Sequence, residues 1–199
     1  LMNDPVTGEV DLKSIGLSNI ESIIIRTNAD LSLGGQGVGG VIEISSARAT
    51  GIELSSGIGS FGYKNYGLEA GGNYGEHNLS LSLHSTAEEG DYLYTTPEGM
   101  EATRLNNDYH TASYFLKYNG NIVGMDAVFS YHHFVNKRGA PGSIINPATL
   151  DRIERISDGL TLNLDKSVGS WNYHIHSSIL RNDTENRTYY FYGGDTLEY

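Results

Sequence analysis

The stretch Leu79-Ser80-Leu81-Ser82-Leu83-His84 decides the fold, because its apolar and polar residues alternate strictly. A period of two places the apolar side chains on one face of an extended strand and the polar ones on the other. The same alternation recurs at 66–74, 112–118, 125–131, 160–165 and 173–179. Together with the segment 51–59, these stretches predict about seven strands and an all-β, antiparallel fold.

The connections between these strands alternate between short and long. Short turns containing glycine are expected at 75–77, 119–121 and 168–170, and long polar segments at 87–107, at 137–154 and in a tail from Arg181 onward. The first connection, Ser60-Phe61-Gly62, is short and breaks this order. Short turns at one end and long loops at the other are typical of a transmembrane β-barrel, with the long loops outside the cell.

The apolar faces of the expected strands have aromatic ends. Tyr66 and Tyr74 bracket Leu68, Ala70 and Gly72 over eight residue steps, or about 19 Å at a 45° tilt, near the ~25 Å apolar band of outer-membrane barrels. Aromatic residues also stand beside the short turns at Tyr74, Tyr118 and Trp171. We expect one shared outward face formed by Leu79, Leu81, Leu83, Tyr114, Leu116, Phe129, Leu162 and Ile175. A soluble antiparallel sheet with one wet face is the alternative.

Composition narrows the classes of partner. Asp and Glu number 24 against 13 Lys and Arg, for a net charge of −11, which argues against nucleic-acid binding. Cysteine is absent, which excludes disulfides and thiolate chemistry. Residues 1–5 show no signal peptide, and no apolar stretch is long enough for a membrane-spanning helix. About seven strands cannot close a barrel, so we expect a fragment of a larger one.

The first fifty residues carry a motif that resembles the end of the plug domain of TonB-dependent outer-membrane receptors. Its pattern is Ile-Glu-x-Ile, about a dozen residues, then Gly-x-Gly-x-Gly-Gly-Val-Ile-x-Ile. The matching positions are Ile20, Glu21, Ile23, Gly35, Gly37, Gly39, Gly40, Val41, Ile42 and Ile44. Further along, Ser60-Phe61-Gly62 resembles that family's first barrel hairpin, and Gly139-Ala140-Pro141-Gly142 resembles a motif in its third extracellular loop. The family usually has Arg-Gly-Pro where this chain has Arg26-Thr27-Asn28.

This resemblance implies two units, residues 1–49 as the C-terminal part of a plug and residues 50–199 as the first strands of a barrel of about 22 strands. It also implies a Gram-negative outer-membrane location and uptake of a scarce large solute, such as a ferric siderophore or cobalamin. A TonB-type energy-coupling protein would drive uptake through an N-terminal segment not present in this sequence. A passive porin or structural barrel, or a soluble β-rich binding module, is the alternative. We expect no enzymatic activity, because no catalytic constellation is evident.

Ligand contacts are expected in the long connections. The candidate ligand-binding residues are Asp91, Tyr92, Tyr94, Asp108 and Tyr109, and the acids Glu88, Glu89, Asp91 and Asp108 could coordinate Ca²⁺, although an ordinary charged loop is the simpler interpretation. The tyrosines form either an aromatic surface for a bulky ligand or an aromatic girdle. His174 and His176 share one face of a strand, but two histidines without a third ligand are more often solvated than bound to metal. We expect Gly34–Gly40 to be a tight turn that admits no Cβ at several positions.

Overall fold

A computed structural model describes residues 20–27, 40–46, 49–144, 146–192 and 195–198, and the structural statements below concern these residues. The strands are β1 (Ile20–Arg26), β2 (Val41–Ser46), β3 (Gly51–Ile58), β4 (Lys64–Tyr74), β5 (His77–Glu88), β6 (Tyr92–Thr95), β7 (Glu101–Arg104), β8 (Tyr109–Ile122), β9 (Met125–Gly139), β10 (Arg152–Val168), β11 (Trp171–Arg187), β12 (Tyr189–Tyr192) and β13 (Asp195–Glu198). One 3₁₀ turn, η4 (Ser60–Gly62), joins β3 to β4. Among the described residues, no helix has the length and apolar character needed to cross a membrane.

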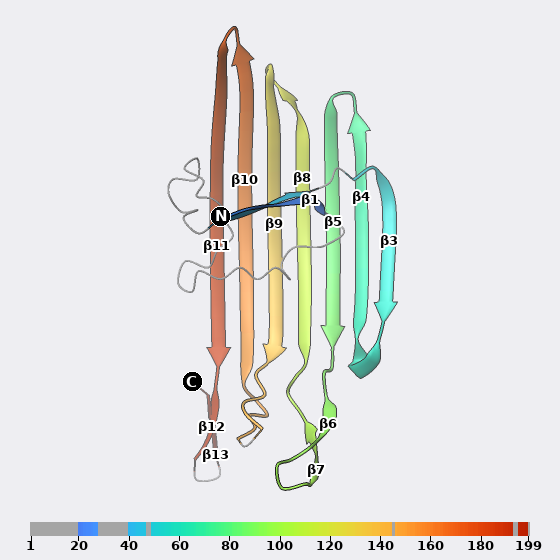
Figure 1. Ribbon diagram of the computed structural model, residues 1–199, viewed down its shortest axis with the longest axis vertical. Helices are drawn as coiled ribbons and strands as arrows, with labels where there is room; N and C mark the ends of the chain where they lie inside the picture. The colour runs from blue at the N-terminus through green and yellow to red at the C-terminus, as the bar shows by residue number, and fades with distance from the viewer. Residues whose placement is uncertain (1–19, 28–39, 47–48, 145, 193–194, 199) are drawn as a thin grey trace.

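Seven strands form one antiparallel sheet in the order β11-β10-β9-β8-β5-β4-β3 (Figure 1). Each strand pairs with the next one along the chain, except that the β6–β7 hairpin branches out between β5 and β8. The predicted all-β class and number of main strands are confirmed. The sheet is open rather than closed, because β3 and β11 each have a neighbour on one side alone.

Cross-strand register places the apolar residues of neighbouring strands opposite one another. Leu81 on β5 pairs with Leu116 on β8, which pairs in turn with Tyr131 on β9. The row continues through Leu160 on β10 to Ile179 on β11. Because directly paired residues point to the same side of a sheet, the expected shared face is confirmed. This side, here called the apolar face, includes Leu79, Leu81, Leu83, Tyr114, Leu116, Phe129, Leu162 and Ile175.

The apolar face is bounded along the two longest strands, β10 and β11. On β10, Leu160, Leu162 and Leu164 lie between Asp158 and Lys166. On β11, the equivalent stretch runs from Tyr173 to Arg181, the residues that pair with Lys166 and Asp158. We call this bounded stretch the apolar band. Its apolar side chains on β11 are exposed, with Tyr173 and Ile175 each 56% and Ile179 68% accessible, whereas on β10 Leu160 is exposed and Leu162 and Leu164 are half-buried.

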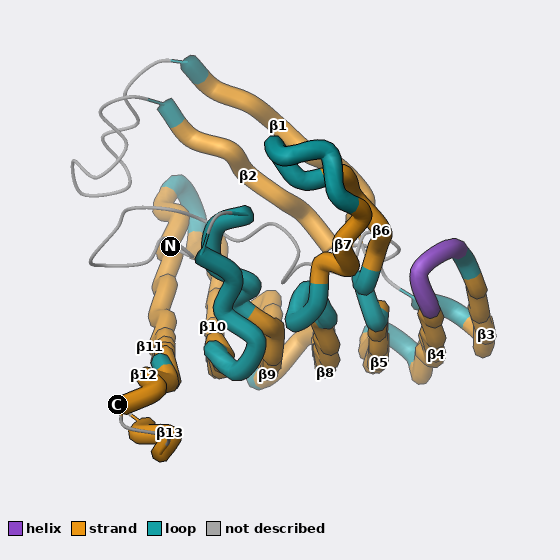
Figure 2. Tube along the Cα trace, turned by 90° about the horizontal axis from the view of Figure 1, so that it is seen from below, coloured by secondary structure: helices purple, strands orange, loops and turns teal. Residues whose placement is uncertain are grey.

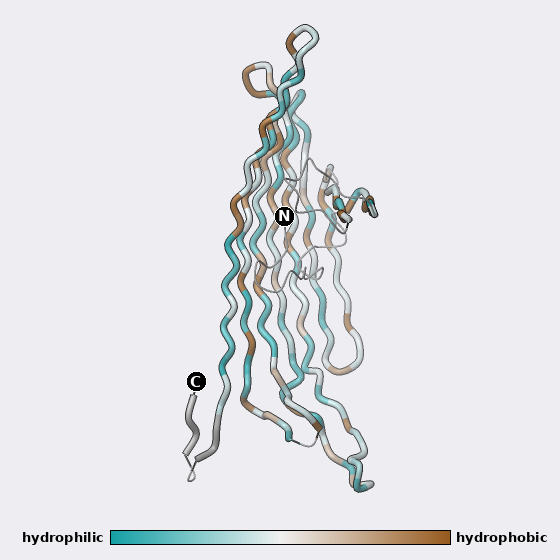
Figure 3. Tube along the Cα trace, turned by 60° about the vertical axis from the view of Figure 1, so that its left-hand side comes forward, coloured by the Kyte–Doolittle hydropathy of each residue, from teal (hydrophilic) through white to brown (hydrophobic). Residues whose placement is uncertain are grey.

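The opposite side, here called the polar face, carries mostly small and polar residues, several of which are buried, together with Phe115, Val128 and the buried Phe134. Asn78 and Ser82 each retain 3% of their accessible surface. The β1–β2 hairpin lies on one side of the sheet (Figure 2). The side-chain amide of Asn78 donates to the backbone carbonyl of Ala49 at 3.3 Å, which places the segment entering β3 against the polar face. Hydrophilic and hydrophobic residues alternate along the strands (Figure 3), as expected for two unlike faces.

Short and long connections lie at opposite ends of the sheet, as expected (Figure 1). The turns at 75–76 and 169–170 are confirmed within one residue. The long segments are more ordered than expected, because 87–107 contains the β6–β7 hairpin and the supposed tail from Arg181 continues β11 to Arg187. The first connection, Ser60–Gly62, lies at the same end as the long loops.

The prediction of a turn at 119–121 is wrong. Strand β8 continues to Ile122, which pairs with Met125, and the turn is formed by Val123 and Gly124. Both have positive φ, 54° and 74°, as a two-residue type I′ hairpin turn requires. The side-chain oxygen of Asn121, which lies within β8, accepts a hydrogen bond from the Gly124 N–H at 2.9 Å and so stabilises the turn. The Asn-Gly pair at 119–120 suggested a turn because it is a common hairpin signal.

The two apolar segments near the N-terminus form an antiparallel pair, β1 with β2. Of the glycine motif, Gly35, Gly37 and Gly39 lie outside the described residues. Gly40 has φ +123°, and a Cβ on it would lie 2.6 Å from the Arg26 carbonyl oxygen. At this position the expectation that a side chain is not admitted is confirmed.

We predict that Val123→Asn stabilises the protein by about 1 kcal/mol. A β-branched residue at positive φ is strained by about 1–3 kcal/mol, whereas Asn adopts this region readily and is the preferred first residue of a type I′ turn. Equilibrium urea unfolding measures the change. Val128→Asn, within β9, is the control and should destabilise; a loss of stability in Val123→Asn would contradict the turn assignment.

Candidate functional site: the loop end of the sheet

The long connections gather at one end of the sheet, called here the loop end (Figure 1). It contains the β3–β4 connection at 59–63, the segment 89–108 with its β6–β7 hairpin, the β9–β10 connection at 140–151, and the chain after β11. Loops carried on a rigid scaffold are the usual place for binding residues. All of the candidate ligand-binding residues lie in or beside this end.

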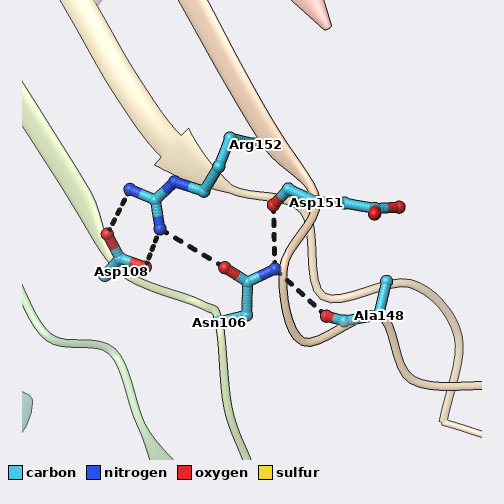
Figure 4. A network of polar contacts seen from close by, with 5 residues as sticks. All are labelled: Asn106, Asp108, Ala148, Asp151 and Arg152. Carbon is cyan, nitrogen blue, oxygen red and sulfur yellow. Dashed lines mark hydrogen bonds and ion pairs between the residues drawn. The ribbon is translucent and has the colours of Figure 1, made fainter. Parts of the chain in front are cut away.

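A polar network at the loop end joins the β7–β8 and β9–β10 connections (Figure 4). Arg152 forms a two-pronged ion pair with Asp108, with nitrogen–oxygen distances of 2.6 and 2.7 Å. The same guanidinium donates to the side-chain oxygen of Asn106 at 3.3 Å. Asn106 in turn donates from its amide nitrogen to the backbone carbonyls of Ala148 at 3.0 Å and Asp151 at 2.8 Å.

Backbone geometry makes Asn106 suited to this role. Its φ is +59°, in the left-handed region that asparagine tolerates better than most residues. Gly139, at the end of β9, packs against it so closely that a Cβ would lie 2.0 Å from the Asn106 carbonyl oxygen. The Gly139 N–H also donates to the Asp108 carbonyl at 2.8 Å. The glycine that begins the Gly139–Gly142 motif is therefore required by a close backbone approach.

Further hydrogen bonds extend this network across the loop end. Asn107 donates to the Gly90 carbonyl at 3.0 Å, and the Gly90 N–H donates to the Phe61 carbonyl at 3.1 Å. On the far side, the Tyr189 N–H donates to the Asp151 carboxylate at 2.9 Å. Together with the central network these bonds form a continuous chain from the β3–β4 connection to the residues after β11. We call this chain the loop belt.

Arg104 adds a separate attachment between the two longest connections. Its guanidinium donates to the Ser143 carbonyl at 3.1 Å and also to the Gly142 carbonyl. The side chain is buried, with 8% of its surface exposed. The β6–β7 hairpin is thereby attached to the β9–β10 connection.

The charge of Asp108 is stabilised by its partner. The hydrogen bond and the positive charge of Arg152 hold the pKa of the Asp108 carboxyl below its usual value, and partial burial opposes this effect. The side chains of both residues remain more than a third exposed, so solvent screens part of the interaction.

Three aromatic rings from two connections meet beside the loop belt; those of Phe61 and Tyr92 are exposed and that of Tyr94 is half-buried. The rings of Phe61 and Tyr92 lie 6.5 Å apart, and those of Tyr92 and Tyr94 lie 6.4 Å apart, both edge to face. We call this group the aromatic cluster. The candidates Tyr92 and Tyr94 are thus brought together, whereas Tyr109 begins β8 and pairs with Glu88 across the strands.

The expected calcium ligands do not converge. Both carboxylate oxygens of Asp108 face Arg152. The Glu89 side chain lies against Gly62, Glu88 is opposite Tyr109, and Asp91 is exposed. In the described part of the chain, no group of three or more His, Cys, Asp or Glu residues is placed to hold a metal ion.

The paired histidines of β11 have protein partners. His174 contacts Asp165 at 2.6 Å, and His176 contacts Asn163 at 2.6 Å, each directly across from it on β10. Both lie on the polar face, as expected. Both contacts are ordinary cross-strand hydrogen bonds.

No family model matches this chain. Sequence reasoning identified Tyr92, Tyr94 and Asp108, but not Phe61, Asn106 or Arg152 as members of the site. Phe61 lies in a three-residue connection that looked like a simple turn. Arg152 lies 44 residues from Asp108, and no local pattern predicts a pairing at that distance.

We predict that Asp108→Asn loosens the 140–151 connection. It leaves Arg152 without its carboxylate, and the opening free energy of this connection should fall by about 1 kcal/mol. Amide hydrogen exchange of residues 140–151 measures the change. Asp91→Asn, which removes an exposed carboxylate outside the loop belt, should leave this exchange unchanged; equal loosening in both variants would contradict the role of the ion pair.

The same ion pair has a defined pH dependence. Because the folded pKa of Asp108 lies below its ordinary value of 3.8, its contribution is fully present above pH 3.8 and is lost as the pH falls through the lower folded value. Exchange of residues 140–151, corrected for the intrinsic rate, should remain slow at pH 4 and increase at lower pH in the wild type. In Asp108→Asn this acid-dependent increase should be absent.

Proposed function

We propose that this chain is a wall segment of an outer-membrane β-barrel receptor that takes up a scarce large solute with energy supplied by a TonB-type protein. The observation that carries the proposal is the exposed apolar band, bounded at both edges, on a sheet whose long connections all lie at one end. In this proposal the apolar face contacts lipid, the loop end faces the external medium, and residues 1–49 belong to a plug.

The dimensions of the apolar band support contact with lipid. On β10, eight residue steps separate Asp158 from Lys166, or about 19 Å at a 45° tilt, close to the ~25 Å apolar band of known barrels. Aromatic residues stand at the short-turn edge of the band, where a membrane interface favours them. They are Tyr74, Tyr118, Trp171 and Tyr173.

The polar face supports an aqueous or plugged interior. Five buried side-chain atoms in the described part of the chain have no hydrogen-bond partner, and all belong to residues of this face, namely Glu69, Ser82, Asn119, His132 and Asn136. Of these, the Glu69 Oε1 has a longer contact, 3.5 Å from the His84 Nε2. Each such group costs about 1–3 kcal/mol unless water or another segment satisfies it. A hydrophilic occupant of this side, such as water or the plug, supplies those hydrogen bonds. The β1–β2 hairpin lies on one side of the sheet, and Ala49 reaches this face.

The loop belt favours a receptor over a passive porin. A receptor gains affinity when its binding loops are ordered before the ligand arrives, because less conformational entropy is lost on binding. The loop belt orders four connections in this way, and the aromatic cluster provides an exposed contact surface beside it. The solute would first meet the protein here. TonB coupling itself is taken from the resemblance of the plug motif.

We predict that Ile175→Arg impairs membrane assembly and that His176→Arg does not. The two residues are neighbours on β11 and both are exposed, but they lie on opposite faces. Arginine within a lipid-facing band costs up to about 2–4 kcal/mol, whereas on an aqueous wall it costs little.

The measurement is heat-modifiable assembly and recovery in the outer-membrane fraction, carried out in the full-length protein. Ile175→Arg should lower recovery and His176→Arg should not. Equal recovery of both variants would exclude lipid contact of the apolar face and favour the soluble β-rich module. Assembly of His176→Arg together with solute uptake that persists without energy coupling would favour the passive porin.

A further inference from the structure

We propose that the aromatic cluster binds a small water-borne organic cation, of the quaternary or alkyl ammonium type, or a larger solute that presents such a group. The inference rests on the proposed function for the placement of the loop end in the external medium, and it specifies the charge class of the solute.

Two rings of the aromatic cluster are exposed although Tyr92 contacts both of the other rings, and Tyr94 is half-buried. Phe61 retains 57% of its accessible surface and Tyr92 retains 41%. The rings come from two separate connections, 59–63 and the start of β6, so no single local sequence brings them together. Each edge-to-face contact covers one face of one ring, and an exposed ring face is the surface to which a cation is attracted.

The backbone holds Phe61 in an outlying conformation. Its φ is +56°, inside a 3₁₀ turn. Its carbonyl accepts two hydrogen bonds at 3.1 Å, from the N–H groups of Glu89 and Gly90. These bonds join the connection that carries Phe61 to the connection that carries Tyr92 and Tyr94. The rings are therefore positioned before any ligand binds.

Charge around the aromatic cluster selects for a cation. The segment 88–107 contains five carboxylates and one basic residue, Arg104. Two of the carboxylates neighbour the ring-bearing residues along the chain: Asp91 precedes Tyr92, and the Glu89 side chain lies against Gly62, the residue after Phe61. An anionic solute would meet unfavourable potential here, whereas a cation would gain from both the ring faces and the carboxylates.

The basic residue of this segment is unsuited to occupying the rings itself. Arg104 pairs with Tyr92 across the β6–β7 hairpin. Its guanidinium, however, is directed to the Gly142 and Ser143 carbonyls, and its side chain is 8% exposed. Its charge offsets one of the five carboxylates, so the formal net charge of the segment is −4.

The test compares choline with 3,3-dimethyl-1-butanol, which has the same shape without the charge. Binding to the full chain in detergent micelles is measured by titration calorimetry and by tyrosine fluorescence. We expect choline to bind and its neutral analogue to bind at least several-fold more weakly. Choline affinity should also fall as ionic strength rises, because the carboxylates are exposed.

Variants then assign the site. Phe61→Leu and Tyr92→Leu should each weaken choline binding roughly two- to fivefold, the range expected for one exposed cation–ring contact. Asp91→Asn should weaken choline but leave the neutral analogue unchanged. Tyr74→Leu is the matched control, because Tyr74 is an exposed tyrosine beside a short turn at the other end of the sheet, and it should bind choline normally.

Three results would overturn the proposal. Equal affinity for choline and the neutral analogue would indicate that the aromatic cluster binds through apolar contact and does not recognise the positive charge. Equal losses in Tyr74→Leu and Tyr92→Leu would indicate non-specific contact with exposed tyrosines. Tighter binding of phosphocholine than of choline would indicate an anion site. Because both ends of the sheet are accessible in micelles, these outcomes are independent of the Ile175→Arg test of membrane assembly.

Discussion

The register of the seven-stranded sheet is the constraint on which the rest of the structure depends. Every main strand alternates between unlike residues, so a shift of one residue in any pairing would carry that strand's polar side chains into the apolar face. The observed register avoids this across all strands, for example where Leu81, Leu116, Tyr131, Leu160 and Ile179 form one continuous row. Both the apolar band and the polar face exist because the register is held.

Register also determines which residues meet at the loop end. Pairing of Arg152 with Gly139 and of Tyr109 with Arg138 places the ends of β8, β9 and β10 side by side. Asp108, one residue before β8, is thereby brought within reach of the Arg152 guanidinium. The loop belt is thus a consequence of sheet pairing, and its side chains then order connections that have little regular structure of their own.

The two ends of the sheet are stabilised differently. At the short-turn end the chain reverses in two residues, as at Val123 and Gly124, and backbone conformation is the main determinant. At the loop end the connections are long, and side-chain hydrogen bonds to backbone carbonyls, from Asn106, Asn107 and Arg104, replace a regular ladder. Such bonds satisfy backbone groups that would otherwise depend on water. The loop end can therefore present an ordered surface, including the aromatic cluster, to a ligand.

The sequence by itself determined the strand number, the two unlike faces and the alternation of connections, because these depend on a period of two and on local turn residues. It placed Tyr92 and Tyr94 in a candidate site because they lie in one of the long connections. It misplaced the β8–β9 turn, because Asn119-Gly120 has the composition of a turn while hydrogen bonding continues to Ile122. The tertiary structure alone decided that Asp108 pairs with Arg152 instead of joining a group of carboxylates, and that Phe61 joins the tyrosines. Both contacts join residues from different connections that are distant in the chain, and no local sequence pattern contains such a contact.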